Sequence, residues 1–184
     1  MIRAFLALGL PDAISDSLVA LQADLPHDMA GAPVPEENFH ITLSFLGTQP
    51  VPVLEDLHLA LEPLRVPAFA LSLSGVDLFG SARPRAAIAK VAPSQALADL
   101  HKKVSVAARL TGIELERRRF VPHVTLARLR NPNAVEAAEM RDFAARHADF
   151  RSAEFQAKEV SLYRSTLRRG GPPTYEVIAA YPLR

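Results

Sequence analysis

The sequence predicts an α+β fold of two pseudo-symmetric lobes, each of antiparallel sheet with helices, flanking a central cleft. Strand and helix patterns follow one another irregularly and include two hairpins, instead of the steady βαβ rhythm of a parallel sheet. A short strand motif occurs once in each half of the chain, which indicates two similar lobes. Because no linker or low-complexity segment interrupts the pattern, residues 1–184 are expected to form one bilobal domain.

The first half of the chain alternates strand and helix patterns. Pro11 suits the first turn of a helix, and apolar residues then recur at helical spacing. The expected elements are a strand at 2–9, a helix with Ile14, Leu18, Leu21 and Leu25 on one face, a loop from Pro26 to Pro35, a strand at 39–46 that stops at Gly47, and a helix containing Leu54, Leu57 and Leu61.

The second half contains two predicted hairpins. Residues 68–79 alternate apolar and polar side chains, which is typical of a strand, and Ser94 is a suitable N-cap for the next helix. The expected elements are a strand at 68–79, a turn from Gly80 to Pro84, a strand from Ala86 to Val91, a helix after Ser94 that closes near Gly112, a strand at 120–129, a turn from Asn131 to Asn133, a helix at 134–146, a strand at 155–164, a turn from Gly170 to Pro173 and a strand at 174–181.

The composition is that of an ordinary globular protein and excludes several kinds of site. Apolar residues make up 49% and charged residues 22% of the chain, and the net charge is +1, so RNA binding would need a local basic patch. The absence of Cys excludes disulfides, thiolate zinc sites and a cysteine nucleophile, and it fits a reducing cytoplasm. The apolar run after Arg3 is too short for a signal peptide, and no run reaches transmembrane length. We therefore expect a cytoplasmic protein with no membrane partner and no obligate protein partner.

The repeated motif reads FHITLSFLG in the first half and PHVTLARLR in the second. Its histidines, His40 and His123, lie 83 positions apart. Strand side chains alternate between faces, so each His shares a face with the Thr two positions later, Thr42 or Thr125. About 0.2 His-x-Thr matches are expected by chance in such a chain, so two matches are roughly a one-in-fifty event. Two half-exposed strands without a chemical role remain the alternative.

Paired His-x-Thr strands of this kind resemble the 2H phosphoesterase superfamily, and in particular its LigT-like branch of RNA 2′,3′-cyclic phosphodiesterases, also called 2′-5′ RNA ligases. The resemblance covers essentially the whole chain: it includes IRAFLALGLP, PEENFHITLSFLG, FVPHVTLARLR and the closing VSLYRSTLRRGGPPTYEVIAAYPL. It implies the bilobal fold and hydrolysis of RNA 2′,3′-cyclic phosphates to 2′-phosphomonoesters without a cofactor. It also implies 2′-5′ RNA ligation as a secondary activity.

Two histidines on opposite walls of a cleft suit an in-line displacement at phosphorus. One imidazole would take a proton from water and the other would give a proton to the leaving oxygen, and pKa values near ~6.5 would leave one neutral and one charged. The hydroxyls of Thr42 and Thr125 would hold phosphate oxygens. Neither motif carries a carboxylate beside its His, and the HExxH pattern is absent, so no metal ion is expected.

The resemblance also implies roles that the nearly symmetric motifs cannot assign. It makes His40 the proton donor and His123 the proton acceptor, and it makes Arg128 a phosphate contact. Strict strand alternation places Arg128 on the face opposite His123, so this role requires a bulge or the reach of the long side chain. An exposed Arg at the end of a strand is the alternative.

Further candidate substrate contacts have a weaker basis. Arg119, with its neighbours Arg117 and Arg118, would form a basic rim for an RNA backbone, although such runs are more often solvated turns. Aromatic residues that would stack a base are Phe45, Phe79 and Tyr163, and for Phe45 a core position is favoured because it shares the predicted face of Ile41. Four other histidines lack a partner pattern and are expected to be surface or satisfied core residues: His27, His58, His101 and His147.

The chain departs from the family pattern in its aromatic residues. It has no Trp, whereas this branch often carries one before the first motif and a further aromatic residue near Ile88. The substrate preference is therefore open. The alternatives are a phosphodiesterase for small cyclic nucleotides or ADP-ribose cyclic phosphate, and a nucleotide-binding or RNA-binding module that has lost catalysis.

Overall fold

A computed structural model of the chain describes residues 1–80 and 82–184 and confirms the predicted α+β class. The predicted turn from Gly80 to Pro84 includes Ser81, which lies outside the described residues. The elements are β1 (Ile2–Leu8), α1 (Asp12–Gln22), β2 (Gly31–Pro33), a 3₁₀ turn (Glu36–Asn38), β3 (Ile41–Gln49), α2 (Val51–Leu61), β4 (Phe69–Leu71), β5 (Leu73–Phe79), β6 (Ala86–Val91), α3 (Gln95–Leu110), β7 (His123–Leu129), α4 (Ala134–Arg146), β8 (Phe155–Ala157), β9 (Glu159–Thr166) and β10 (Thr174–Pro182).

The strands form two four-stranded antiparallel sheets, one in each lobe. The first sheet has the order β10-β9-β1-β3, and the second has the order β2-β7-β6-β5. β4 and β8 form a separate antiparallel pair. Because β4 leads into β5 of the second sheet and β8 leads into β9 of the first, this short pair joins the two lobes.

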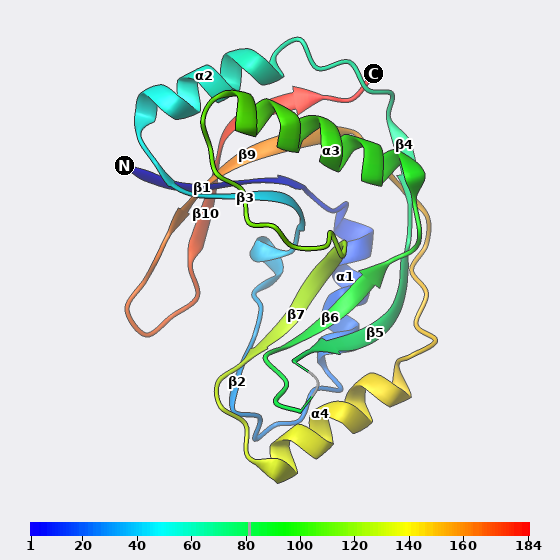
Figure 1. Cartoon of the computed structure of the whole chain (residues 1–184). Coiled ribbons are helices and arrows are strands. Elements are labelled where there is room, and N and C mark those ends of the chain that lie inside the picture. The colour runs from blue at the N-terminus through cyan, green and yellow to red at the C-terminus, as the bar shows by residue number, and fades with distance from the viewer. Residues whose placement is uncertain (81) are drawn as a thin grey trace.

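Two helices are exchanged between the sheets (Figure 1). α1 follows β1 of the first sheet but packs on β7 of the second, and α3 follows β6 of the second sheet but packs on β3 of the first. α2 lies beside α3, and α4 packs on β5 at the opposite end of the molecule. The strands that carry the two motifs, β3 and β7, contact each other where the lobes meet.

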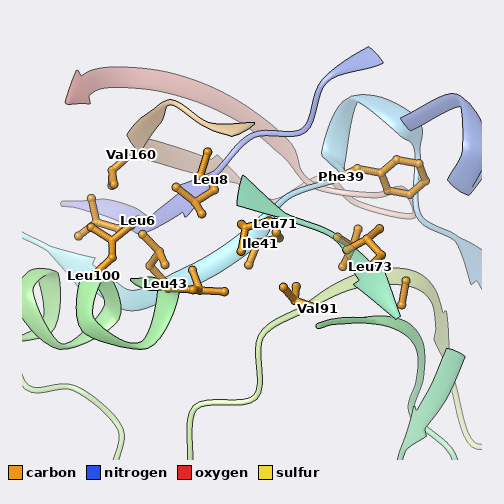
Figure 2. Packing of buried hydrophobic residues seen from close by; sticks show 14 of the residues in the cluster. Leu6, Leu8, Phe39, Ile41, Leu43, Leu71, Leu73, Val91, Leu100 and Val160 are labelled. Carbon is orange, nitrogen blue, oxygen red and sulfur yellow. The ribbon is translucent and has the colours of Figure 1, made fainter. Parts of the chain in front are cut away.

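The buried apolar side chains form one cluster that continues across both sheets (Figure 2). Leu6 and Leu8 of β1 lie in it with Ile41 and Leu43 of β3 and with Leu73 at the start of β5. Removing one such buried side chain typically costs about 2–5 kcal/mol. The apolar backs of the motif strands are therefore held firmly by the core.

Capping residues account for several helix ends. Ser94 accepts a hydrogen bond from the backbone N–H of Leu97 at 3.2 Å, which confirms it as the N-cap of α3. Asn133 caps α4 and forms a capping box with Glu136, which sequence analysis did not identify. α3 ends two residues before Gly112, which has a φ of 82° and closes the helix as predicted.

Several predicted strand boundaries are wrong for a common reason: the strands bend or change partners. β3 begins later than predicted and continues beyond Gly47, because this glycine, with a φ of 71°, lies beside a bulge and bends the strand without ending it. The predicted strand at 68–79 divides at Ser72, and the one at 155–164 divides at Lys158, where each leaves the β4–β8 pair for a four-stranded sheet.

Two further differences concern the second motif. The strand predicted at 120–129 begins only at His123. The segment predicted as a loop from Pro26 to Pro35 contains the short edge strand β2, which pairs with β7. A three-residue strand is too short to show an apolar period, so sequence periodicity could not reveal it.

Gly31 of β2 offers a test of this contact with the second motif strand. It pairs with Leu129 and has a φ of 154°, and a Cβ atom there would overlap the backbone oxygen of Arg128. We expect Gly31→Ala to lower the free energy of unfolding by about 2 kcal/mol or more, measured by urea denaturation. Gly171→Ala is the matched control, since nothing lies within 4 Å of its Cβ position. Equal losses in the two variants would contradict the close approach.

Candidate active site

His40 and His123 are held by the same kind of contact. Nδ1 of His40 lies 2.7 Å from the backbone oxygen of Asn38, and Nδ1 of His123 lies 2.6 Å from that of Val121. A carbonyl oxygen only accepts, so Nδ1 carries the hydrogen in both rings. Nε2 of each neutral imidazole is therefore the proton acceptor, and it becomes a donor once it is protonated.

The residue that orients His40 is fixed in turn by the closing hairpin. Asn38 is buried, and its side-chain amide donates to the backbone oxygen of Pro173 at 2.8 Å. Pro173 belongs to the turn between β9 and β10, so the last hairpin is tied to the first motif. Sequence analysis missed Asn38, whose only signal is its place two residues before the motif histidine.

A β-bulge interrupts each motif strand directly after its His-x-Thr segment. The β1–β3 ladder skips Leu43, because the pairing steps from Thr42 to Ser44. The β6–β7 ladder skips Leu126 in the same way. Leu43 and Leu126 are 83 positions apart, which is also the separation of the two histidines. The internal repeat therefore includes a bulge as well as the polar residues.

The bulges turn the fifth residue after each histidine onto the cleft face. Phe45 and Arg128 would lie opposite the histidines in a regular strand, but one extra residue restores them to the same face. Phe45 is 41% exposed, and the Arg3 guanidinium lies 4.6 Å from its ring centroid. The favoured prediction of a core position for Phe45 is therefore wrong, whereas the bulge required for Arg128 is present.

Side chains from the exchanged helices hold both bulges. Nδ1 of His101 on α3 lies 2.8 Å from the backbone oxygen of Leu43. Nε2 of Gln22 at the end of α1 donates to the backbone oxygens of Leu126, at 2.7 Å, and Val34, at 2.8 Å. These contacts fix the residue at which each ladder is interrupted. His101, expected to be an ordinary surface or core residue, is thus part of the support of the site.

Aromatic rings enclose His40. The rings of Phe5 and His40 have centroids 4.8 Å apart, and Phe5 stacks on Tyr163 at 5.0 Å. Tyr175, which sequence analysis missed, meets His40 edge-on at 5.4 Å. Burial raises the pKa of Tyr163, and a hydrogen bond with the Ser161 side chain partly opposes this rise. The Tyr163 hydroxyl therefore stays protonated at neutral pH. Tyr163 lies with the rings that shield His40 from water.

A cavity of about 680 Å³ is lined by both motif strands. Thr42 and Phe45 line it from β3, and His123 and Arg128 line it from β7. Phe79 also lines it and meets His123 edge-on, with ring centroids 4.7 Å apart. The arrangement offers a hydroxyl, an imidazole and a guanidinium to one bound group.

The arginine run before β7 contributes to the same cavity. Arg118 and Arg119 line it, and Arg118 pairs with Glu116 at 2.9 Å. All three arginines of the run are exposed, as a solvated turn would be, but two of them face this cavity. Thr125 is half-buried on β7, two residues beyond His123 and before the bulge, and so shares its face.

Burial sets the charge state of both imidazoles. It is the main reason that the pKa of His40 falls from 6.5 to about 4; the Asn38 carbonyl opposes the fall, and the charges of Arg128 and His123 add to it. Burial also lowers the pKa of His123; the hydrogen bond to the Val121 carbonyl opposes this fall, and the charge of Arg128 adds to it. Both rings are therefore neutral at pH 7. The expectation that one would be charged does not hold for the protein by itself.

Comparison with known proteins places this site in a family. Residues 10–169 match the family model of the 2′-5′ RNA ligase superfamily. The chain belongs to the 2′-5′ RNA ligase superfamily. The resemblance seen in the two motifs is thereby confirmed.

Curated relatives in this superfamily carry a common name. An RNA 2′,3′-cyclic phosphodiesterase from Geobacillus stearothermophilus is 36% identical over 153 residues, which cover 82% of this chain and 47% of that protein. The chain thus spans about half the length of that relative. A protein of the same name from Methanocaldococcus jannaschii is 29% identical over 180 residues, which cover 96% of this chain and 98% of the relative.

Solved structures related to the superfamily confirm the bilobal fold. TT0787 of Thermus thermophilus superposes with a TM-score of 0.83 at 27% identity, covering 100% of this chain and 98% of that one. Escherichia coli LigT complexed with 3′-AMP superposes with a TM-score of 0.79 at 25% identity, covering 99% and 98%. Both lobes are therefore shared along their full length.

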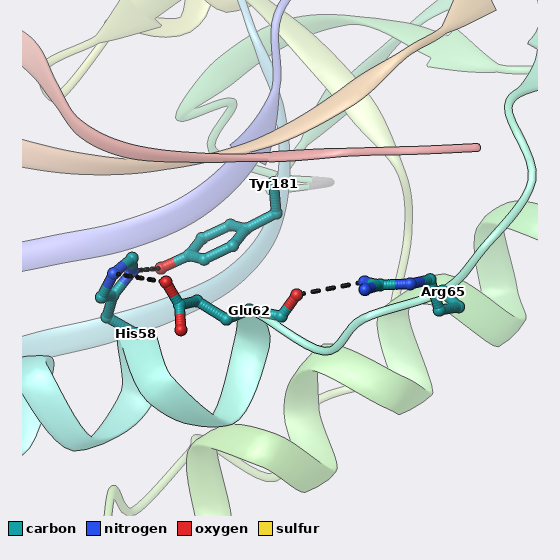
Figure 3. Close-up of polar contacts among 4 residues, drawn as sticks. All are labelled: His58, Glu62, Arg65 and Tyr181. Carbon is teal, nitrogen blue, oxygen red and sulfur yellow. Dashed lines mark hydrogen bonds and ion pairs between the residues drawn. The ribbon is translucent and has the colours of Figure 1, made fainter.

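Two further histidines of this superfamily member have structural contacts away from the motifs. Nδ1 of His58 on α2 lies 3.1 Å from the Tyr181 hydroxyl, and its Nε2 lies 3.5 Å from the Glu62 carboxylate (Figure 3). Burial raises the pKa of Tyr181 to about 12, and the negative charge of Glu62 contributes to this rise. Nε2 of His147 lies 3.1 Å from the Asp24 carboxylate without the alignment of a hydrogen bond. The prediction of a surface or satisfied residue is confirmed for His58, whereas Nε2 of His147 is buried without a hydrogen-bond partner among the described residues.

The structure also bears on metal and membrane binding. Within residues 1–80 and 82–184, no three His, Asp or Glu side chains lie close enough together to share a metal ion. Nor does any helix of the described part have the length and apolarity needed to cross a membrane. The side chains that line the cavity include the hydroxyl of Thr42, the imidazole of His123 and the guanidinium of Arg128.

The charge of Arg128 can be tested through the two histidines of the superfamily motif. Arg128→Gln removes a positive charge that opposes protonation, so the pKa of His40 should rise above about 4 and that of His123 should rise toward 6.5. NMR titration of the imidazole protons measures both values. Arg128→Lys keeps the charge and should keep the low pKa values. Unchanged values in Arg128→Gln would show that this side chain does not face the site.

Proposed function

We propose that this protein hydrolyses RNA ends that carry a 2′,3′-cyclic phosphate and releases 2′-phosphomonoesters. The observation that carries the proposal is the matched pair of imidazoles: His40 and His123 each bind a carbonyl through Nδ1 and keep Nε2 for proton transfer. The names of the relatives, RNA 2′,3′-cyclic phosphodiesterase, support the same substrate class.

The reaction needs one proton acceptor and one proton donor on opposite sides of phosphorus. We assign His123 as the acceptor and His40 as the donor, following the resemblance of their motifs to the family. His123 takes a proton from water as the water oxygen bonds to phosphorus. The bond from phosphorus to the 3′-oxygen breaks on the other side, and His40 protonates that oxygen. The phosphate stays on the 2′-oxygen.

Three side chains are suited to hold the phosphate during this step. The hydroxyls of Thr42 and Thr125 can each donate to a non-bridging oxygen, one from each lobe. Arg128, turned to the cleft face by its bulge, adds a charge-assisted donor. Since the donors come from different lobes, we propose that residues 1–184 act as one bilobal unit, which the continuous apolar cluster supports.

The low pKa values of the free site fit a substrate that carries negative charge. A phosphate anion beside the imidazoles stabilises their protonated forms, so substrate binding raises both pKa values and favours uptake of the proton that the donor needs. Arg128 opposes protonation only while its charge is not matched by an anion. The site is thereby charged by its own substrate.

The first test is hydrolysis of a short RNA ending in a 2′,3′-cyclic phosphate, in the presence of EDTA. We expect the wild type to form the 2′-phosphate, and His40→Ala and His123→Ala each to lower kcat by about 10²–10⁴-fold, because each removes one proton transfer. His27→Ala, in an exposed loop, is the matched control and should retain wild-type activity.

The outcomes of this test separate the candidate functions. Activity that requires a metal ion, or that survives the loss of either motif histidine, would contradict the two-imidazole mechanism. Tight binding of the cyclic-phosphate RNA by a wild type that never turns it over would instead indicate a binding module.

The pH dependence of kcat/KM provides an independent check. The reaction uses one protonated and one neutral imidazole, so kcat/KM should rise through the lower pKa of the free protein and fall through the higher one. With His40 at about 4 and His123 below 6.5, the optimum should lie between these values. The optimum of kcat should lie at higher pH because bound phosphate raises both pKa values. A flat kcat/KM profile from about pH 4 to 8 would contradict acid–base catalysis by these residues.

A further inference from the structure

The catalytic cavity continues beyond the motif residues along α3 and the segment that precedes β7. Charged side chains are concentrated there, although the whole chain has a net charge of only +1. Among the described residues, the charged side chains that line the cavity are Arg85, Arg109, Arg118, Arg119 and Arg128, with Glu116 as the sole carboxylate.

These guanidinium groups are largely unmatched by acidic side chains. Arg118 pairs with Glu116 at 2.9 Å. Within the part of the chain that the structure describes, no carboxylate lies within 4.0 Å of the guanidinium groups of Arg85, Arg109 and Arg119. Positive charges gathered in one concave surface create a field that attracts an anionic ligand.

A single phosphate would not use all of this charge. A cyclic mononucleotide with a 5′-hydroxyl carries only the cyclic phosphate, and Arg128 with the two motif threonines already serves that group. Arg109, Arg118 and Arg119 lie on other elements and remain available for further phosphates. An RNA strand supplies such phosphates at regular intervals on the 5′ side of its terminal cyclic phosphate.

An aromatic pair lies among these arginines. The rings of His101 and Phe120 are parallel within 4°, with centroids 3.9 Å apart, and both residues line the cavity. The contact of His101 with the Leu43 carbonyl fixes the orientation of the pair. A positively charged groove with aromatic rings is the combination by which proteins hold single-stranded nucleic acid.

We infer that this arm of the cavity, formed by Arg109, Arg118, Arg119, His101 and Phe120, binds the single-stranded RNA that leads into the cyclic end. The inference rests on the proposed function and deepens it, because it makes an RNA strand, rather than a cyclic mononucleotide, the preferred substrate. The guanidinium groups contact the backbone phosphates, and Phe120 contacts a base.

The test compares a five-nucleotide RNA with a mononucleotide, both ending in a 2′,3′-cyclic phosphate. The wild type should show a higher kcat/KM for the RNA. Arg109→Gln and Arg119→Gln should each lower the RNA-to-mononucleotide ratio of kcat/KM by about tenfold, because each removes a charge-assisted contact to a phosphate. Arg141→Gln, on the exposed face of α4 and outside the cavity lining, is the matched control and should keep the wild-type ratio.

A binding titration with labelled five-nucleotide RNA ending in a 2′-phosphate decides the inference without turnover. The logarithm of affinity should fall with the logarithm of salt concentration, and each Arg→Gln change should reduce that slope by about 0.7. Phe120→Leu should weaken binding about tenfold while leaving the slope unchanged, because it removes a stacking surface and no charge.

The two assays distinguish failure of the inference from failure of the proposed function. If the wild type hydrolyses the mononucleotide at least as well as the RNA, or if the salt slope is the same in Arg109→Gln and Arg141→Gln, the arm does not bind RNA. Tighter binding of ATP than of the RNA would also overturn it, in favour of a polyphosphate nucleotide. If the wild type hydrolyses neither substrate, the proposed function fails, and the titration still decides whether the arm binds RNA.

Discussion

The site depends on two skipped backbone positions, Leu43 and Leu126, and on the side chains that hold their carbonyl groups. Without the bulges, Phe45 and Arg128 would point away from the histidines, and the cleft would lose the guanidinium that lies on a motif strand. A bulge persists where its freed backbone groups find partners, and His101 and Gln22 are partners at these two places. The placement of Phe45 and Arg128 in the cleft therefore depends on hydrogen bonds made by residues outside the repeated motif.

The exchange of α1 and α3 explains how those partners arrive. α1 brings Gln22 to the bulge of β7, and α3 brings His101 to the bulge of β3, although each helix follows a strand of the other sheet. The two motif strands contact each other, and one apolar cluster lies behind both. Displacing one lobe would thus disturb the bulge of the other, so the relative placement of the two imidazoles is fixed by covalent connection and by packing together.

The fold class could be predicted from the sequence, and the four polar residues of the repeat could be singled out, because both depend on local patterns of residues. His40, Thr42 and their counterparts follow strand alternation, and helix starts such as Ser94 follow capping chemistry. The predicted core position of Phe45 was wrong because the bulge in β3 turns this residue to the other face, and that bulge depends on the pairing with β1. Sequence analysis also missed Asn38, Tyr175 and His101, whose partners are distant in sequence and leave no periodic signal.

The two copies of the repeat differ at the fifth position after each histidine, and this difference adds to the effect of burial on the electrostatics of the site. Phe45 and Arg128 occupy equivalent places after the two histidines, so a single positive charge acts on both rings. The fall of the His40 pKa from 6.5 to about 4 disfavours the imidazolium by about 3 kcal/mol. A neutral ligand leaves that cost in place, whereas a phosphate anion offsets it and also binds Arg128. The twofold repeat supplies the proton carriers as a pair, and its one asymmetric arginine opposes their protonation until a phosphate anion lies between them.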